Sequence, residues 1–150
     1  MSPAAPGAEE AVRTLPALLV VDAANVVGAR PDGWWRDRPG AAARLVARLT
    51  DAARLRRPVR WVAVLEGAAK AGVPETPEGS PAQPAVVHAA GAGDDTIAEQ
   101  AAALAAAHPT EPLGVVTADR GLQARLPPTA QLIGPRTLWA VLDAVADTDG

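Results

Sequence analysis

Five short apolar runs, separated by polar segments, set the pattern of this chain. A continuous apolar run between polar segments, without alternation of polar and apolar positions, is typical of a strand buried on both faces of a parallel sheet. The pattern therefore predicts five buried strands. They cover Leu18–Val21, Val59–Leu65, Ala85–His88, Leu113–Thr117 and Ala130–Ile133.

Helical periodicity occupies most of the segments between these runs. Helices are predicted over about 40–55, about 94–107, a short stretch after Asp119, and Pro135 to about Ala146. In the first of them Leu45, Leu49 and Ala52 share one face, as expected of a helix that packs on a sheet. The segments 26–39 and 67–84 are rich in Gly and Pro and are predicted to be loops.

Strands that alternate with helices predict an α/β fold with right-handed crossovers. The expected architecture is a three-layer α/β/α arrangement around a five-stranded parallel sheet. Several strand orders fit five strands, and we favour 3-2-1-4-5, numbering the strands along the chain. In that order the first and fourth strands are neighbours where the winding reverses, and ligands bind in the crevice that opens there.

The length of 150 residues suits one domain, which is expected to cover residues 17–147. Residues 1–16 are rich in Pro, Ala, Gly and Glu and are predicted to be disordered, and residues 148–150 are predicted to be a frayed tail. The N-terminal segment lacks the pattern of a signal peptide, and no apolar run has the length of a membrane span. A cytoplasmic protein that does not bind membranes is therefore expected.

Composition excludes several kinds of site. The chain has no cysteine, which rules out disulfides, thiolate metal ligands and a cysteine nucleophile. It also has no Walker A motif and no G-x-S-x-G nucleophile elbow. The net charge of −3 does not indicate binding to a polyanion, so a nucleic-acid function has to rest on particular residues. Carboxylates that hold a hard metal ion remain open.

Acidic residues follow the carboxyl ends of the predicted strands. Asp22 ends the first strand, Glu66 follows the second and Asp119 follows the fourth. Asp94 and Asp95 open the helix after the third strand. Each acid alone could be the N-cap of a helix or the start of an Asx turn. As a set at one sheet edge, they predict a Mg²⁺ or Mn²⁺ site that assists the attack of water on a phosphodiester.

Three segments also resemble the motifs of a known family. They are Leu19–Gly28 (LVVDAANVVG), Gly93–Ile97 (GDDTI) and Val115–Arg120 (VVTADR). Together they look like the acidic motifs of the NYN domains of the PIN-like nuclease superfamily, in particular its YacP-like ribonuclease branch. The resemblance runs from about Leu18 to the final predicted helix. It implies a PIN-like fold, a Mg²⁺ or Mn²⁺ site and endoribonuclease activity.

The resemblance also implies roles for particular residues. The implied metal-site residues are Asp22, Asp94 or Asp95, and Asp119, with Asn25 assisting. From the residues alone, Asn25 either orients Asp22 or binds substrate, and an Asx turn is the alternative. Glu66 stands where relatives often have Asp, and Gly121 stands where many PIN domains keep another acid. These departures predict that one metal site is weakened or lost.

The loop after the first strand carries candidates for binding RNA. Of the adjacent pair Trp34 and Trp35, one is expected to pack on the sheet edge or on a helix, and Trp34 is our candidate for stacking on a base. Arg36, Arg38 and Arg120 are the candidates for contacting phosphates.

The sequence therefore predicts a metal-dependent endoribonuclease that hydrolyses the phosphodiester bonds of RNA, either single-stranded or ribosome-associated. The predicted catalytic residues are Asp22, Asn25, Asp94 and Asp119. The predicted metal ligands are Asp22, Glu66, Asp94, Asp95 and Asp119. Two alternatives stay open: a metal-dependent nucleotide phosphohydrolase, and a catalytically silent PIN-like interaction domain. The oligomeric state is also open, with a homodimer as one alternative.

Overall fold

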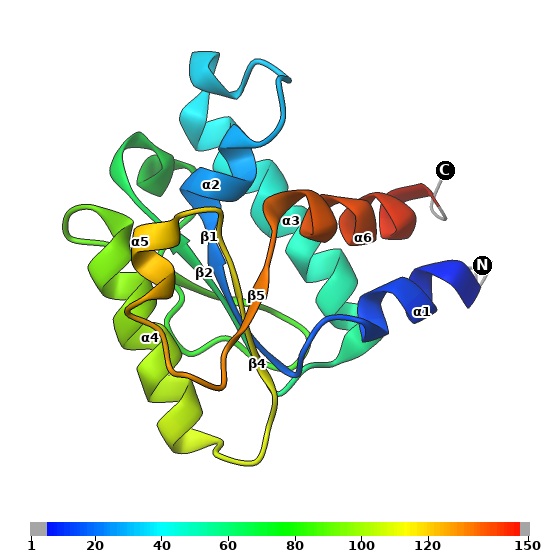
Figure 1. The fold of residues 1–150 in the computed structure, drawn as a ribbon. Helices are drawn as coiled ribbons and strands as arrows, with labels where there is room; N and C mark the ends of the chain where they lie inside the picture. The colour runs from blue at the N-terminus through cyan, green and yellow to red at the C-terminus, as the bar shows by residue number, and fades with distance from the viewer. Residues whose placement is uncertain (1–5, 148–150) are drawn as a thin grey trace.

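Figure 1 shows a computed structural model of the chain, which describes residues 6–147. Its middle layer is a parallel sheet with the strand order β3-β2-β1-β4-β5. The strands are β1 (Leu18–Asp22), β2 (Arg60–Leu65), β3 (Ala85–His88), β4 (Leu113–Val116) and β5 (Gln131–Ile133). The α/β class, the five parallel strands and their order are as the sequence predicted, which confirms the expected architecture.

Helices cover both faces of the sheet. Their bounds are α1 (Pro6–Arg13), α2 (Ala23–Gly28), α3 (Arg38–Arg56), α4 (Gly93–Ala107), α5 (Arg120–Gln123) and α6 (Pro135–Asp147), with 3-10 turns η1 (Trp34–Arg36) and η2 (Gly67–Gly72). In Figure 1, α1, α2, α3 and α6 lie on one side of the sheet, and α4 and α5 lie on the other. Within the described residues, no helix is both long and apolar enough to cross a membrane.

Strand β1 contributes to two hydrophobic cores, one on each face of the sheet. Successive residues of a strand point to opposite faces. Leu19 and Val21 therefore join the core under α1, α3 and α6, whereas Leu18 and Val20 join the core under α4. This explains why the run is apolar at every position and why every residue of β1 is buried, including Asp22 at its end.

Helix α1 corrects part of the prediction that residues 1–16 are disordered. The structure has a helix over Pro6–Arg13, which packs against α6 and α3. Ala8, Val12 and Leu15 are buried in the core, and their spacing gives a narrow apolar stripe on an otherwise polar segment. The Pro, Ala and Glu content concealed this stripe. Residues 1–5 and the predicted tail, 148–150, lie outside the described residues.

Helix α2 corrects the prediction of a loop over 26–39. The chain turns directly from β1 into this short helix, because Asp22 is its N-cap and accepts a hydrogen bond from the backbone of Asn25. The rest of the predicted loop holds η1, and the predicted loop over 67–84 begins with η2. Residues of η1 and η2 line the pocket at the carboxyl edge of the sheet that is described below.

Candidate functional site

Asp22 lies at the centre of the carboxyl edge of the sheet. It is only 5% exposed, and both of its carboxylate oxygens accept hydrogen bonds. Oδ1 accepts from the backbone N–H of Asn25 at 3.3 Å, and Oδ2 accepts from Asn25 Nδ2 at 2.6 Å and from Thr117 Oγ1 at 2.9 Å. The carboxylate is therefore held in one orientation by the first turn of α2 and by the end of β4.

The environment of Asp22 disfavours its ionised form. Burial raises the pKa of the Asp22 carboxyl above its ordinary value of 3.8. The hydrogen bonds from Thr117 and Asn25 lower that pKa in part, whereas the negative charge of Glu66 raises it further. A buried carboxylate that is ionised next to a second carboxylate is stabilised by a cation.

Glu66 approaches the same edge from the end of β2. Its Oε2 accepts a hydrogen bond from the backbone N–H of Gly93, the first residue of α4. A Cβ atom at position 93 would lie 3.0 Å from Glu66 Oε2, so glycine allows this close approach. Glu66 therefore links β2 to the start of α4 and stays within electrostatic reach of Asp22.

Two of the other predicted acids have partners of their own. Asp119 is the N-cap of α5, with Oδ1 accepting from the N–H groups of Gly121 at 2.8 Å and Leu122 at 3.2 Å. Asp95 forms an ion pair of 2.6 Å with Arg125. Asp94 lies in the first turn of α4, whose N-cap is a residue without a capping side chain.

The five predicted acids therefore do not form one cluster. Among residues 6–147, no group of three or more His, Asp or Glu side chains is arranged to hold a metal ion. Of the other four acids, Glu66 is the one whose charge contributes to the raised pKa of Asp22. Asp119 has the capping role that the sequence left open as an alternative.

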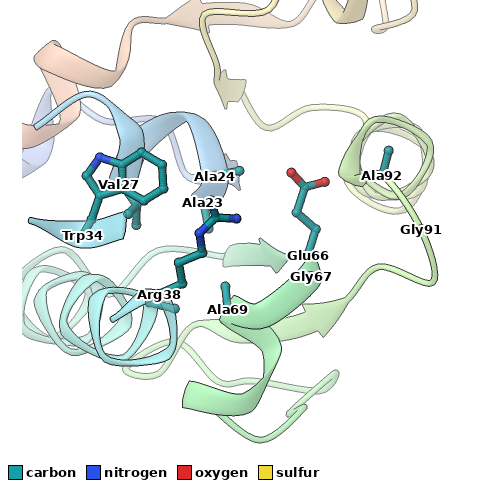
Figure 2. Close-up of a pocket in the computed structure, with 11 residues that line it drawn as sticks. Ala23, Ala24, Val27, Trp34, Arg38, Glu66, Gly67, Ala69, Gly91 and Ala92 are labelled. Atoms are coloured by element: carbon teal, nitrogen blue, oxygen red, sulfur yellow. The ribbon is translucent and has the colours of Figure 1, made fainter. Parts of the chain in front are cut away.

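A pocket of about 530 Å³ lies beside this pair of carboxylates. Figure 2 shows Glu66 at one end and Trp34 at the other, with the guanidinium of Arg38 between them. Ala23 and Ala24, which directly follow Asp22, form part of the wall. Two of the residues predicted to bind RNA, Trp34 and Arg38, thus line one pocket next to the buried carboxylate.

The remaining predicted RNA-binding residues lie outside this pocket. Arg36 is exposed, and its guanidinium lies 5.9 Å from the ring centre of Trp35, which is 51% exposed. Arg120 is exposed at the start of α5. A second, more open pocket of about 740 Å³ on the other side of α2 is lined in part by Asn25 and Arg136.

Two contributions to the site were missed by sequence reasoning. The first is Thr117, whose hydroxyl donates to Asp22 and accepts from the backbone N–H of Asp119 at 3.1 Å. A signal for it existed, because the predicted strand order already placed the end of the fourth strand beside Asp22.

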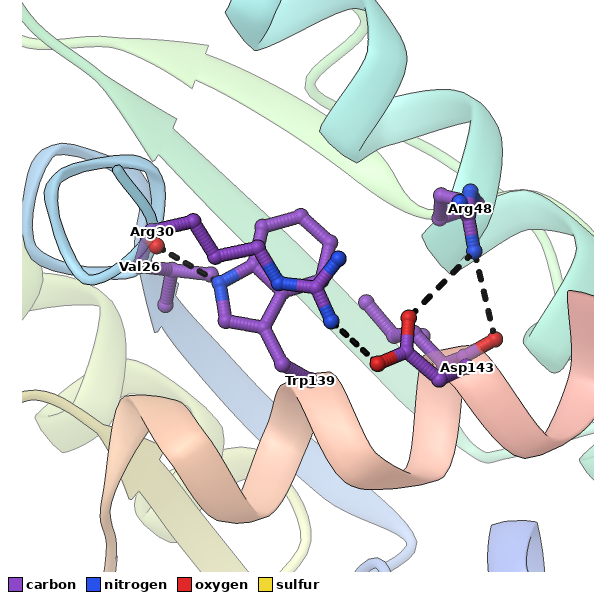
Figure 3. A network of polar contacts seen from close by, with 6 residues as sticks. Val26, Arg30, Arg48, Trp139 and Asp143 are labelled. Atoms are coloured by element: carbon purple, nitrogen blue, oxygen red, sulfur yellow. Dashed lines mark hydrogen bonds and ion pairs between the residues drawn. The ribbon is translucent and has the colours of Figure 1, made fainter. Parts of the chain in front are cut away.

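The second missed contribution is a network that fixes α2 against α6 (Figure 3). Trp139 Nε1 donates to the carbonyl oxygen of Val26 at 2.7 Å. The Arg30 guanidinium lies 4.0 Å from the centre of the Trp139 ring and forms an ion pair with Asp143, which Arg48 also approaches at 3.8 Å. Nothing in the local sequence pattern indicates contacts between residues more than one hundred positions apart.

Comparisons with known proteins bear on the fold. No protein-family model and no curated protein sequence matches this chain. Among solved structures, the chain is similar to the crystal structure of Rae1 (YacP) from Bacillus subtilis, with a TM-score of 0.66 and 18% sequence identity. The match covers 87% of this chain and 76% of that chain. The chain therefore has a YacP-like fold, which is the fold that the three sequence motifs predicted.

Proposed function

We propose that this chain is a metal-dependent endoribonuclease that hydrolyses phosphodiester bonds of RNA at the carboxyl edge of β1 and β2. The observation that carries the proposal is the environment of Asp22. Capping α2 needs one oxygen of this carboxylate, yet the other is fixed by two further hydrogen bonds, one of them from Thr117, which directly follows the neighbouring strand β4. A carboxylate that is buried and oriented in this way is suited to an ion or a reacting group.

The donor set at this edge fits Mg²⁺ or Mn²⁺. Magnesium in proteins is usually bound by one or two carboxylates and completed by waters and substrate phosphates, rather than by a full cage of side chains. Asp22 and Glu66 are two such carboxylates, so a third acid is not required. Asp94 and Asp119, on the helices that begin at this edge, are the further candidates. When bound, the ion would neutralise phosphate charge and lower the pKa of the attacking water.

The residues of the chain itself have separate tasks in this proposal. Asn25 and Thr117 hold the Asp22 carboxylate in place, and the backbone of Gly93 holds Glu66. Arg38 supplies positive charge to the phosphate backbone. The choice of RNA, single-stranded or ribosome-associated, rests on the motif resemblance. We also propose a cytoplasmic location, as the sequence analysis expected.

Cleavage of an end-labelled single-stranded RNA, with Mn²⁺ or with EDTA, tests the proposal. We expect cleavage that requires Mn²⁺ and falls by about 100-fold or more in Asp22→Asn, since that change removes a ligand charge and keeps the shape. Asp51→Asn, on the outer part of α3, is the matched control and should cleave like the unaltered protein. Equal cleavage by a folded Asp22→Asn protein, or full activity in EDTA, would reject the proposal.

The volume of the pocket favours one second candidate, a metal-dependent nucleotide phosphohydrolase. A space of about 530 Å³ is of the size that holds a single small ligand. Nucleoside triphosphates offered in the same assay separate the two candidates. Hydrolysis of triphosphates that depends on Asp22, with RNA left intact, would replace the first proposal by the second. Neither activity would indicate a catalytically silent interaction domain.

A further inference from the structure

The pocket between α2, η1, α3 and η2, which we call the slot, is lined mainly by small residues. Most of its wall consists of Ala and Gly, whose small side chains leave the space open. Its volume of about 530 Å³ falls in the lower part of the range for small-ligand pockets, which is about 300–1,000 Å³. One nucleotide unit can enter a space of this size, whereas a duplex cannot.

Trp34 forms the aromatic wall of this slot, and the local backbone explains why. Gly33 has a φ of 84°, in the left-handed region that favours glycine, and η1 begins directly after it. The turn places the neighbouring tryptophans differently, with their rings 6.0 Å apart and nearly perpendicular. Trp34 is half-buried and lines the pocket, whereas Trp35 faces solvent. An aromatic wall in an Ala-lined slot suits stacking with a planar base.

Arg38 gives the slot a positive charge that is not paired with an acidic side chain of residues 6–147. Within residues 6–147 it forms no ion pair and no hydrogen bond, and its guanidinium lies 5.4 Å from the ring centre of Trp34. In Figure 2 this guanidinium points toward the Glu66 end of the pocket, the end next to the carboxylate edge. Guanidinium groups bind phosphate through paired hydrogen bonds, so Arg38 is placed to hold a phosphate beside that edge.

We infer that this slot binds one unpaired nucleotide, with its base against Trp34 and its phosphate on Arg38. The inference rests on the proposed function for the statement that the nucleotide belongs to an RNA chain, but not for the binding itself. A base can stack on Trp34 only when it has left its own helix, so the substrate class is single-stranded RNA with at least one splayed base. The phosphate on Arg38 is then the one presented to Asp22 and Glu66.

Binding of a mononucleotide without metal tests the slot directly. Uridine 5′-monophosphate and uridine are titrated into the full chain in EDTA, and binding is followed by calorimetry. Trp34→Leu should weaken binding of both ligands about tenfold, whereas Trp34→Phe, which keeps an aromatic face, should restore most of it. Arg38→Gln should weaken only the phosphorylated ligand. Trp35→Leu is the matched control and should bind like the unaltered protein.

The outcomes separate this inference from the proposed function. Three results would overturn the inferred nucleotide site. They are wild-type affinity in a folded Trp34→Leu protein, no binding by the unaltered protein, and an equal loss of affinity in Trp35→Leu. If the nucleotide binds through Trp34 but no RNA is cleaved, the slot stands and the proposed function fails. If RNA is cleaved with an unchanged KM in Trp34→Leu, the proposed function stands and the slot fails.

Discussion

Two places in this molecule bring a tryptophan, an arginine and a carboxylate together, and only one of them is complete in itself. Where α2 meets α6, Arg30 lies 4.0 Å from the ring centre of Trp139 and forms an ion pair with Asp143. The indole N–H of Trp139 is also bonded, to the carbonyl oxygen of Val26. We call Trp139, Arg30 and Asp143 the closed triad, because its charges are paired within the protein.

The second place is the pocket wall, where Trp34, Arg38 and Glu66 form what we call the open triad. Arg38 is farther from its ring, at 5.4 Å, and has no acidic partner within residues 6–147. Glu66 accepts from a backbone amide rather than from an arginine. The same three kinds of side chain therefore stabilise the fold in one place and remain available to a ligand in the other.

The largest expected effect is on RNA cleavage, when the carboxylate of each triad is replaced by its amide. Glu66→Gln should lower RNA cleavage by about 100-fold, because it removes charge from the proposed ion site while its amide oxygen still accepts from Gly93. Asp143→Asn should cleave within about twofold of the unaltered protein, since the closed triad only holds α2 and α6 together. Values of kcat/KM for the two variants decide. Similar losses in both would abolish the distinction between the triads.

Replacing an arginine by glutamine should give a smaller effect, which is measured in the salt dependence of RNA binding. Each arginine that contacts a phosphate contributes about 0.7 to the slope of log affinity against log salt for a single strand. Arg38→Gln should flatten the slope by about this amount and so should Arg120→Gln, whereas Arg30→Gln should not. Binding measured by fluorescence anisotropy over a series of salt concentrations provides the slopes. A flatter slope in Arg30→Gln would show that the closed triad also meets RNA.

Exchanging the tryptophan of the closed triad should change stability rather than binding. Trp139→Phe loses the hydrogen bond to Val26 and part of the contact with Arg30, which together are worth about 1–2 kcal/mol of the free energy of unfolding. For a chain of this length the melting temperature should fall by several degrees. Trp35→Phe, at an exposed position, is the control and should melt normally. An unchanged melting temperature in Trp139→Phe would show that the closed triad does not stabilise the fold.

The smallest effect concerns pH and the carboxyl beside the open triad. Because the pKa of Asp22 is raised in the folded protein, the folded state binds this proton more tightly than the unfolded chain does. Stability should therefore decrease as pH rises from 3.8 through the raised pKa, and then stay level. Asp22→Asn should lack this decrease. Denaturant unfolding of both proteins in EDTA, from a pH below 3.8 to neutral pH, measures this decrease. If the free energies of unfolding of the two proteins depend on pH in the same way, the burial of the Asp22 carboxylate would be contradicted.

The sheet could be predicted from the sequence because its strands are apolar at nearly every position. That pattern identifies strands buried on both faces, and the favoured strand order placed Asp22 and Glu66 at the same edge of the sheet. Helix α1 was missed because the apolar stripe is short: Ala8 and Val12 within the helix, and Leu15 just after it. Helix α2 was missed because six residues are too few to show a helical period.

The orientation of the acidic side chains could not be predicted. Sequence placed Asp119 and Asp95 at the correct edge, but it does not state whether a carboxylate turns toward the site, toward a helix N-terminus or toward an arginine. In the structure, Asp119 turns toward the N-terminus of α5 and Asp95 turns toward Arg125. The same limit applies to the tryptophans: the sequence named Trp34 as the candidate for stacking, but the placement of its ring follows from the turn at Gly33.

The indole N–H signals of the tryptophans, followed by NMR while uridine 5′-monophosphate is added, test the central claim most directly. Trp34 belongs to the open triad and Trp139 to the closed one, so one spectrum observes both. The account predicts that the Trp34 signal shifts with saturation, while the Trp139 signal keeps its position. A shift of Trp139 as large as that of Trp34, or no shift of Trp34 at saturating nucleotide, would contradict it.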